Sequence, residues 1–180
     1  MLKGICPLIS PALLKVLSEM GHGDEIVLAD AHFPAMSLGP QVIRADGVGI
    51  PGLLEGILQL IPLDQYDPDH FALMEVCAGD TVVPTIWEEY AAITAKAEPE
   101  TTPTMVERFA FYERAKKAYC IVATGETAQY ANIILKKGVV RGRTAGHGRQ
   151  SVGEPFPCAL PAFLRAKWLP ALWRGAGCMV

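Results

Sequence analysis

A histidine between two glycines is the first residue of this chain that stands out for chemistry. It lies in the stretch Met20-Gly21-His22-Gly23-Asp24, where the glycines predict a turn and leave the imidazole with little steric cover. An imidazole titrates near neutral pH, so it can both donate and accept a proton. His22 is therefore a candidate general acid or base, although an ordinary polar turn residue would give the same local pattern.

A carboxylate ends the next apolar run. Residues 25–30 are typical of a short buried strand, and Asp30 is its last residue. Open α/β sheets bind their ligands at the C-terminal ends of strands. Asp30 is thus a candidate for holding a hydroxyl group or for acting as a base, with ordinary turn chemistry as the alternative.

Two further pairs of residues carry weaker signals. Arg108 and Tyr112 are four residues apart in a predicted helix, so both can present polar tips from one face. A helical face of aromatic residues is nevertheless more often part of a core. Tyr130 and Asn132 lie in a turn that enters a strand, and an aromatic ring next to an amide suits a polyhydroxylated ligand.

The motifs of several other enzyme classes are missing. The chain has no phosphate-binding glycine loop, no H-E-x-x-H and no G-x-S-x-G. Its four histidines do not cluster with its five cysteines at metal-ligand spacing. These absences favour acid/base chemistry on a small polar ligand, with no cofactor and no metal.

The elements that must position these residues alternate between helices and short apolar strands. This alternation predicts a layered α/β domain whose central sheet is covered on both faces and is largely parallel or mixed. We predict helices over 11–20, 51–61, 84–96 and 106–118, strands over 25–30, 41–44, 71–76, 119–124 and 132–135, and a loop over 98–104.

The composition is that of a globular protein of one ordinary domain. The chain has 180 residues, of which 51% are hydrophobic and 19% charged, so it can bury a sizeable core and is not disordered throughout. It has no apolar run of about 18 residues and no signal-peptide pattern at its start, so we expect no membrane association. The net charge of -3 argues against a nucleic-acid partner, and the scattered cysteines without a C-x-x-C pair favour the cytoplasm.

The charge changes sign near residue 140. Residues 1–140 hold 10 Lys/Arg and 18 Asp/Glu, whereas residues 141–180 hold six Lys/Arg and one Glu, with six glycines and four prolines. We therefore predict a domain over 1–140 and a Pro/Gly/Arg-rich, poorly ordered extension over 141–180. A short basic amphipathic helix in the extension, interrupted by Pro161 and Pro170, is the alternative.

Several of these motifs occur together, and in the same order, in the L-fucose mutarotase family, which is related to D-ribose pyranase. The resemblance runs from residue 1 to about residue 140 and stops where the charge changes. It rests on Leu8-Ile9-Ser10-Pro11, residues 20–26, Ala29-Asp30 with Phe33-Pro34, residues 43–47, residues 108–115, Thr124-Gly125-Glu126, and Tyr130-x-Asn132 through Lys136-Lys137-Gly138.

The resemblance implies a three-layer α/β/α sandwich that forms homo-oligomers with active sites near subunit interfaces. It also implies interconversion of the α and β anomers of L-fucose without a cofactor. The catalytic histidine of the family falls on His22 and its active-site tyrosine on Tyr112. The residues that hold the sugar fall on Asp30, Arg108, Tyr130 and Asn132, and similarity to some members adds Asp64 and Met74 to the pocket.

One departure and two other functions remain open at this point. The family has glycine where this chain has Ala131, and alanine there costs on the order of 1 kcal/mol if the backbone needs a positive φ, but nothing if it is extended. Ring exchange between pyranose and furanose forms, as in ribose pyranase, uses the same acid/base steps. A non-catalytic, sugar-binding regulatory protein is an alternative from a different class.

Overall fold

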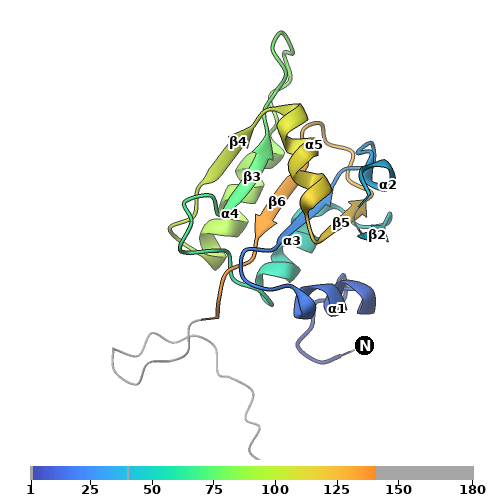
Figure 1. Ribbon diagram of the computed structural model, residues 1–180, viewed down its shortest axis with the longest axis vertical. Helices are drawn as coiled ribbons and strands as arrows, with labels where there is room; N and C mark the ends of the chain where they lie inside the picture. Colours follow the sequence, from blue (N-terminus) through green and yellow to red (C-terminus); the bar gives the residue numbers. More distant parts are fainter. Residues whose placement is uncertain (1, 40, 141–180) are drawn as a thin grey trace, which may run out of the picture. The chain divides into compact units, whose positions relative to one another are not determined.

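The computed structural model describes residues 2–39 and 41–140, and the extension expected at 141–180 lies outside these residues. Helices and strands alternate along the described part, as the sequence predicts (Figure 1). The helices are α1 (Pro11–Glu19), α2 (Ala35–Leu38), α3 (Ile50–Leu58), α4 (Ile86–Ala97) and α5 (Arg108–Lys117), and the strands are β1 (Glu25–Ala29), β2 (Gln41–Ala45), β3 (Phe71–Met74), β4 (Pro103–Val106), β5 (Cys120–Thr124) and β6 (Ile133–Lys136).

The strands form one mixed sheet in the order β2-β5-β1-β6-β3-β4. Strand β5 pairs in parallel with β2 and β1, and β3 pairs in parallel with β4. Strand β6 is antiparallel to both of its neighbours, β1 and β3. The C-terminal ends of β1 and β3 therefore lie next to the N-terminal end of β6, at one end of the sheet.

Both faces of the sheet are covered by helices. Successive side chains of a strand point to opposite faces, and in β1 Ile26 and Leu28 pack in a core with residues of α1, α3 and α4. Val27 and Ala29 pack in a second core with residues of α2 and α5. The two cores confirm the predicted three-layer α/β/α sandwich with a mixed sheet.

The structure corrects the prediction of a loop over residues 98–104. Strand β4 begins at Pro103 and pairs with β3 at the edge of the sheet. Its residues are alternately exposed and half-buried, so no apolar run marks the strand in the sequence. Proline is tolerated at an edge because its missing N–H breaks no ladder hydrogen bond there.

Candidate active site

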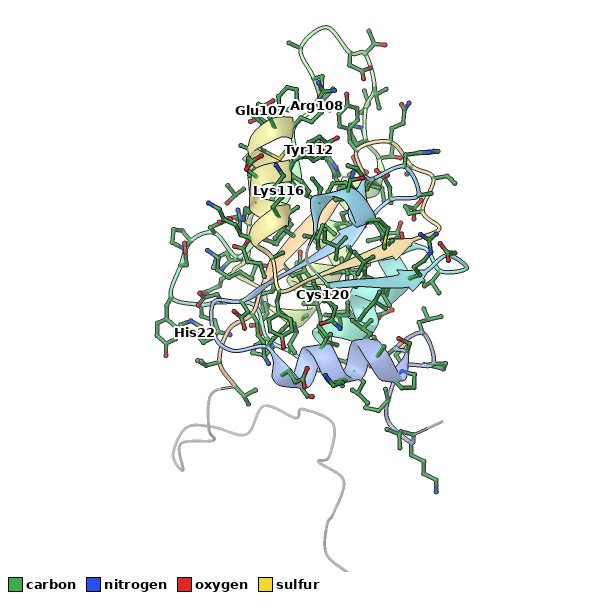
Figure 2. All side chains as sticks on the ribbon, turned by 45° about the vertical axis from the view of Figure 1, so that its right-hand side comes forward. His22, Glu107, Arg108, Tyr112, Lys116 and Cys120 are labelled. Atoms are coloured by element: carbon green, nitrogen blue, oxygen red, sulfur yellow. The ribbon has the colours of Figure 1, made fainter. Side chains whose placement is uncertain are left out.

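The residues expected at the site lie at two ends of the sheet. His22 precedes β1 and Asp30 follows it, and the five residues of β1 span roughly 16 Å at about 3.3 Å per residue. Figure 2 shows His22 at the opposite end of the domain from Arg108 and Tyr112. Within one copy of the chain, the expected catalytic histidine therefore lies far from most of the expected sugar-binding residues.

A pocket of about 300 Å³ lies at the C-terminal end of β1. Six of the residues singled out in the sequence line it together. The lining consists of these six, Asp30, Met74, Arg108, Tyr112, Tyr130 and Asn132, together with His32, Phe33, Cys77, Asp80, Ala128 and Gln129.

Asp30 is held in place at the base of this pocket. Its side chain is buried, and its two carboxylate oxygens accept hydrogen bonds from the backbone N–H of His32 (2.9 Å) and from Nδ2 of Asn132 (2.6 Å). The backbone N–H of Asp30 in turn donates to Oδ1 of Asn132 at 2.9 Å. A buried carboxylate needs such donors to offset its lost hydration, so Asp30 presents a fixed acceptor to a ligand hydroxyl.

The hydroxyl of Tyr130 makes two hydrogen bonds. It donates to Oδ2 of Asp80 at 2.6 Å and accepts from the backbone N–H of Cys77 at 3.2 Å. The hydrogen bond to Asp80 raises the pKa of Tyr130 to about 12, and the same bond lowers the pKa of Asp80. The phenol therefore stays protonated at neutral pH.

The backbone angles near Tyr130 show that alanine at position 131 is not strained. Tyr130 is the one described non-glycine residue with a positive φ, 57°, so the left-handed position is Tyr130 and not Ala131. Ala131 is fully buried, and its carbonyl accepts a hydrogen bond from the Tyr90 hydroxyl at 2.8 Å. Alanine at this position carries no positive-φ penalty.

Helix α5 brings Arg108 and Tyr112 to the pocket from one face, as their spacing predicts. The helix begins at Arg108 because the Glu107 side chain accepts hydrogen bonds from the backbone N–H groups of Phe109 and Ala110. The Tyr112 ring packs edge-on against Phe33 with ring centres 5.5 Å apart. The aromatic residues of this helix are thus divided, with Phe111 in the core and Phe109 62% exposed.

At the other end of the sheet, His22 and Asp64 form a pair. Nε2 of His22 lies 3.1 Å from Oδ1 of Asp64, with side chains 46% and 6% exposed. Burial acts to raise the pKa of Asp64, but hydrogen bonds from the Tyr66 backbone N–H and from His22 outweigh burial, so the pKa lies below its usual value. Asp64 does not line the pocket at Asp30; it holds the histidine instead.

Cys77 and Asp80 are among the pocket residues that were not predicted from the sequence. They lie in the connection after β3, where Gly79 has a positive φ of 87°. Glycine and aspartate are residue types typical of turns, so Gly79 and Asp80 fit a connecting loop. Nothing in these residue types indicated that Asp80 would reach Tyr130, 50 residues away.

Among residues 2–39 and 41–140, no group of three or more His, Cys, Asp or Glu side chains is close enough to hold a metal ion. Of the helices in the same residues, none is long and apolar enough to cross a membrane.

Comparison with known proteins agrees with this fold. Residues 3–140 match the RbsD / FucU transport protein family. The chain belongs to this family. The match within the RbsD / FucU family covers the residues that build the sheet and both groups of site residues, and it ends where the charge of the chain changes.

Relatives within the RbsD / FucU family are similar over nearly their whole length. The chain is 59% identical over 140 residues to an L-fucose mutarotase of Actinobacillus pleuropneumoniae serotype 5b, covering 77% of this chain and 97% of the relative. It is 55% identical to the fucose mutarotase of Streptococcus pneumoniae solved in complex with L-fucose, with a TM-score of 0.75 and coverage of 78% and 100%. It is 51% identical to FucU of Bifidobacterium longum, with a TM-score of 0.76 and coverage of 77% and 100%.

Proposed function

We propose that this protein is an L-fucose mutarotase, an isomerase that interconverts the α and β anomers of L-fucose. The observation that carries the proposal is the pocket that gathers Asp30, Arg108, Tyr112, Tyr130 and Asn132. The chain is 55% identical to a fucose mutarotase that was solved with L-fucose.

The reaction requires only proton transfers. A base removes the proton of the anomeric hydroxyl while an acid protonates the ring oxygen, which breaks the bond between the ring oxygen and the anomeric carbon and leaves an open-chain aldehyde. After rotation about the bond next to the aldehyde carbon, the ring closes on the other face with the proton transfers reversed. His22 and Tyr112 serve as the proton carriers, and the fixed oxygens and amide of Asp30 and Asn132 hold sugar hydroxyls.

The proposal includes a site shared between two copies of the chain. His22 and the Asp30 pocket lie at opposite ends of β1, so one copy alone does not bring the proton carrier to the sugar. Exposed apolar side chains flank both regions: Phe109 and Met36 on the pocket side are 62% and 68% exposed, and Tyr66 beside His22 is 69% exposed. Burial of such side chains favours association, and a homo-oligomer that seats His22 of one copy over the Asp30 pocket of another completes the site.

We also place the protein in the cytoplasm. The support is the cysteine usage of the chain, in which Cys6, Cys77 and Cys120 are free thiols. Burial raises the pKa of the Cys120 thiol to about 11, so this thiol remains in its protonated form.

Saturation-transfer NMR on L-fucose at anomeric equilibrium tests the activity directly. Irradiation of one anomeric proton should reduce the signal of the other in the presence of the protein, and this transfer should vanish in His22→Ala. The side chain of His22 is half exposed, so the variant should keep the circular dichroism spectrum of the parent. A folded parent that transfers no saturation contradicts the proposal, and D-ribose in the same experiment tests exchange between pyranose and furanose rings.

A further inference from the structure

The segment Lys136-Lys137-Gly138 contacts both loops that carry the His22–Asp64 pair. On the His22 side, the backbone N–H of Lys137 donates to the Asp24 carbonyl at 2.9 Å, and the Lys137 carbonyl accepts from the N–H of Gly23 at 2.8 Å. These two hydrogen bonds fix the residues that directly follow His22.

The side chain of Lys137 fixes the residues on the other side of His22. Its Nζ donates to the carbonyl of Leu17 at 2.8 Å and to the carbonyl of Met20. These carbonyls belong to the last turn of α1 and its C-cap, where backbone oxygens lack helical partners and the helix dipole favours a cation. The last turn of α1 has no basic residue of its own, so Lys137 supplies this charge from a position 117 residues away from Met20.

The same segment holds the loop that carries Asp64. The backbone N–H of Asp64 donates to the Lys136 carbonyl at 3.0 Å, and the N–H of Gly138 donates to the Pro62 carbonyl at 2.9 Å. A Cβ atom at Gly138 would lie 2.2 Å from the carbonyl oxygen of Leu63, so the two backbones approach as closely as glycine allows. Lys137 therefore lies between two neighbours that hold the Asp64 loop.

We propose that Lys137 is a positioning residue that holds the His22 loop against the Asp64 loop and thereby sets the hydrogen bond between His22 and Asp64. The effect on turnover rests on the proposed mutarotase function, whereas the effect on the imidazole does not. Without the Lys137 ammonium group, the carbonyls of Leu17 and Met20 lose their donor, and the chain between α1 and β1 is free to shift. Misplacement of a catalytic group by about 1 Å costs up to about a hundredfold in rate.

The experiment compares Lys137→Met, which keeps most of the aliphatic stem but removes the donors, with Lys15→Met as the matched control. Lys15 lies on α1, the helix whose end Lys137 contacts, and it pairs with Glu19 on the surface with its side chain 66% exposed. The control variant therefore loses the same charge at a residue that does not hold the His22 loop. The first readout is the ¹H–¹³C resonance of the His22 imidazole, assigned by its loss in His22→Ala. The second is the anomer-exchange rate as a function of L-fucose concentration.

We expect the His22 resonance to move in Lys137→Met, to stay in place in Lys15→Met, and to return toward the parent position in Lys137→Arg, which restores donors. We also expect the maximal exchange rate to fall by about tenfold or more with KM within about twofold of the parent. A His22 resonance and rate that are unchanged in folded Lys137→Met overturn the proposal.

Two further outcomes remain decisive. If Lys137→Met does not fold, Lys137→Gln, which keeps a shorter donor, must move the His22 resonance away from its parent position, and a parent-like resonance overturns the proposal. If the resonance moves as expected but the parent exchanges no anomers, the positioning role stands and the proposed mutarotase function fails.

Discussion

Asp30 and Asn132, 102 residues apart, are joined by two hydrogen bonds. The backbone N–H of Asp30 donates to Oδ1 of Asn132 at 2.9 Å, and Nδ2 of Asn132 donates to Oδ2 of Asp30 at 2.6 Å. Both side chains are buried, and both line the pocket. The two residues thus act as one rigid polar unit at the junction of antiparallel β1 and β6.

Asn132→Asp should disrupt this unit without changing its size. The substitution places a carboxylate oxygen opposite Oδ2 of Asp30, and two carboxylates this close do not both ionise at neutral pH without strong repulsion. We expect the free energy of unfolding at pH 7 to fall by about 1–3 kcal/mol and L-fucose binding to weaken, as measured by urea unfolding and by titration calorimetry.

The pH dependence separates repulsion from the loss of a hydrogen bond. In Asn132→Asp, the folded pKa of the new pair lies above the unfolded value, so the folded state binds more protons and the stability deficit should shrink as the pH falls toward 5. Asn132→Ala, which adds no charge, should show a smaller recovery. Equal pH profiles for the two variants would contradict the repulsion.

Ala131→Gly restores the residue of the family pattern, yet it should not improve the protein. Ala131 does not take a positive φ and its side chain is fully buried, so glycine gains no relief from strain and increases the backbone entropy of the unfolded state. We expect a loss of about 1 kcal/mol in the free energy of unfolding and an unchanged anomer-exchange rate, measured by urea unfolding and saturation transfer. A faster variant would show that alanine does disturb the neighbouring Tyr130 and Asn132.

The sequence predicts most of the sheet and most of the pocket because both rest on local patterns. Short apolar runs predict β1 and β5, and the spacing of four residues predicts that Arg108 and Tyr112 share a face. Strand β4 was missed because pairing with β3 at the edge of the sheet, and not local apolar character, makes it a strand.

The parts of the site that the sequence does not predict depend on contacts between distant residues. No local pattern indicates that Asp80 reaches the Tyr130 hydroxyl, or that Lys137 reaches the end of α1. The position of His22 at the far end of β1 follows from the strand itself, since a residue before a strand and a residue after it cannot lie together. The resemblance supplied roles for the two groups of residues, and the structure separates them.

The charge of Asp64 should contribute to stability only above acidic pH. The folded pKa of Asp64 is lowered, so its contribution is fully present above the unfolded value near 3.8 and is lost as the pH falls through the folded pKa. Asp64→Asn removes the charge but keeps an acceptor oxygen for the Tyr66 N–H. We expect this variant to be less stable than the parent by about 1 kcal/mol at pH 7 and the difference to shrink below pH 4, as measured by urea unfolding at both pH values. A difference that is independent of pH would assign the loss to packing and not to charge.

Two inactive variants should restore activity to each other if the site is shared between copies. His22→Ala lacks the proton carrier, and Asp30→Asn lacks the carboxylate of the pocket while keeping its size. When both variants are coexpressed in equal amounts and assemble at random, about a quarter of the sites combine an intact His22 from one copy with an intact Asp30 from another. We therefore expect the mixed oligomer to exchange L-fucose anomers at about a quarter of the parent rate, although each variant alone is inactive.

The matched control is a mixture of the two variants purified separately and combined without subunit exchange, which should remain inactive. A second control is the double variant His22→Ala/Asp30→Asn expressed alone. Its oligomer contains no intact residue of either kind and should be inactive. If the site lay within one copy, every subunit of the mixed oligomer would carry one defect and no activity would return. An inactive mixed oligomer, shown by mass spectrometry to contain both variants, therefore contradicts a shared site. His22 and Asp30 of one chain would then have to act together despite their separation along β1.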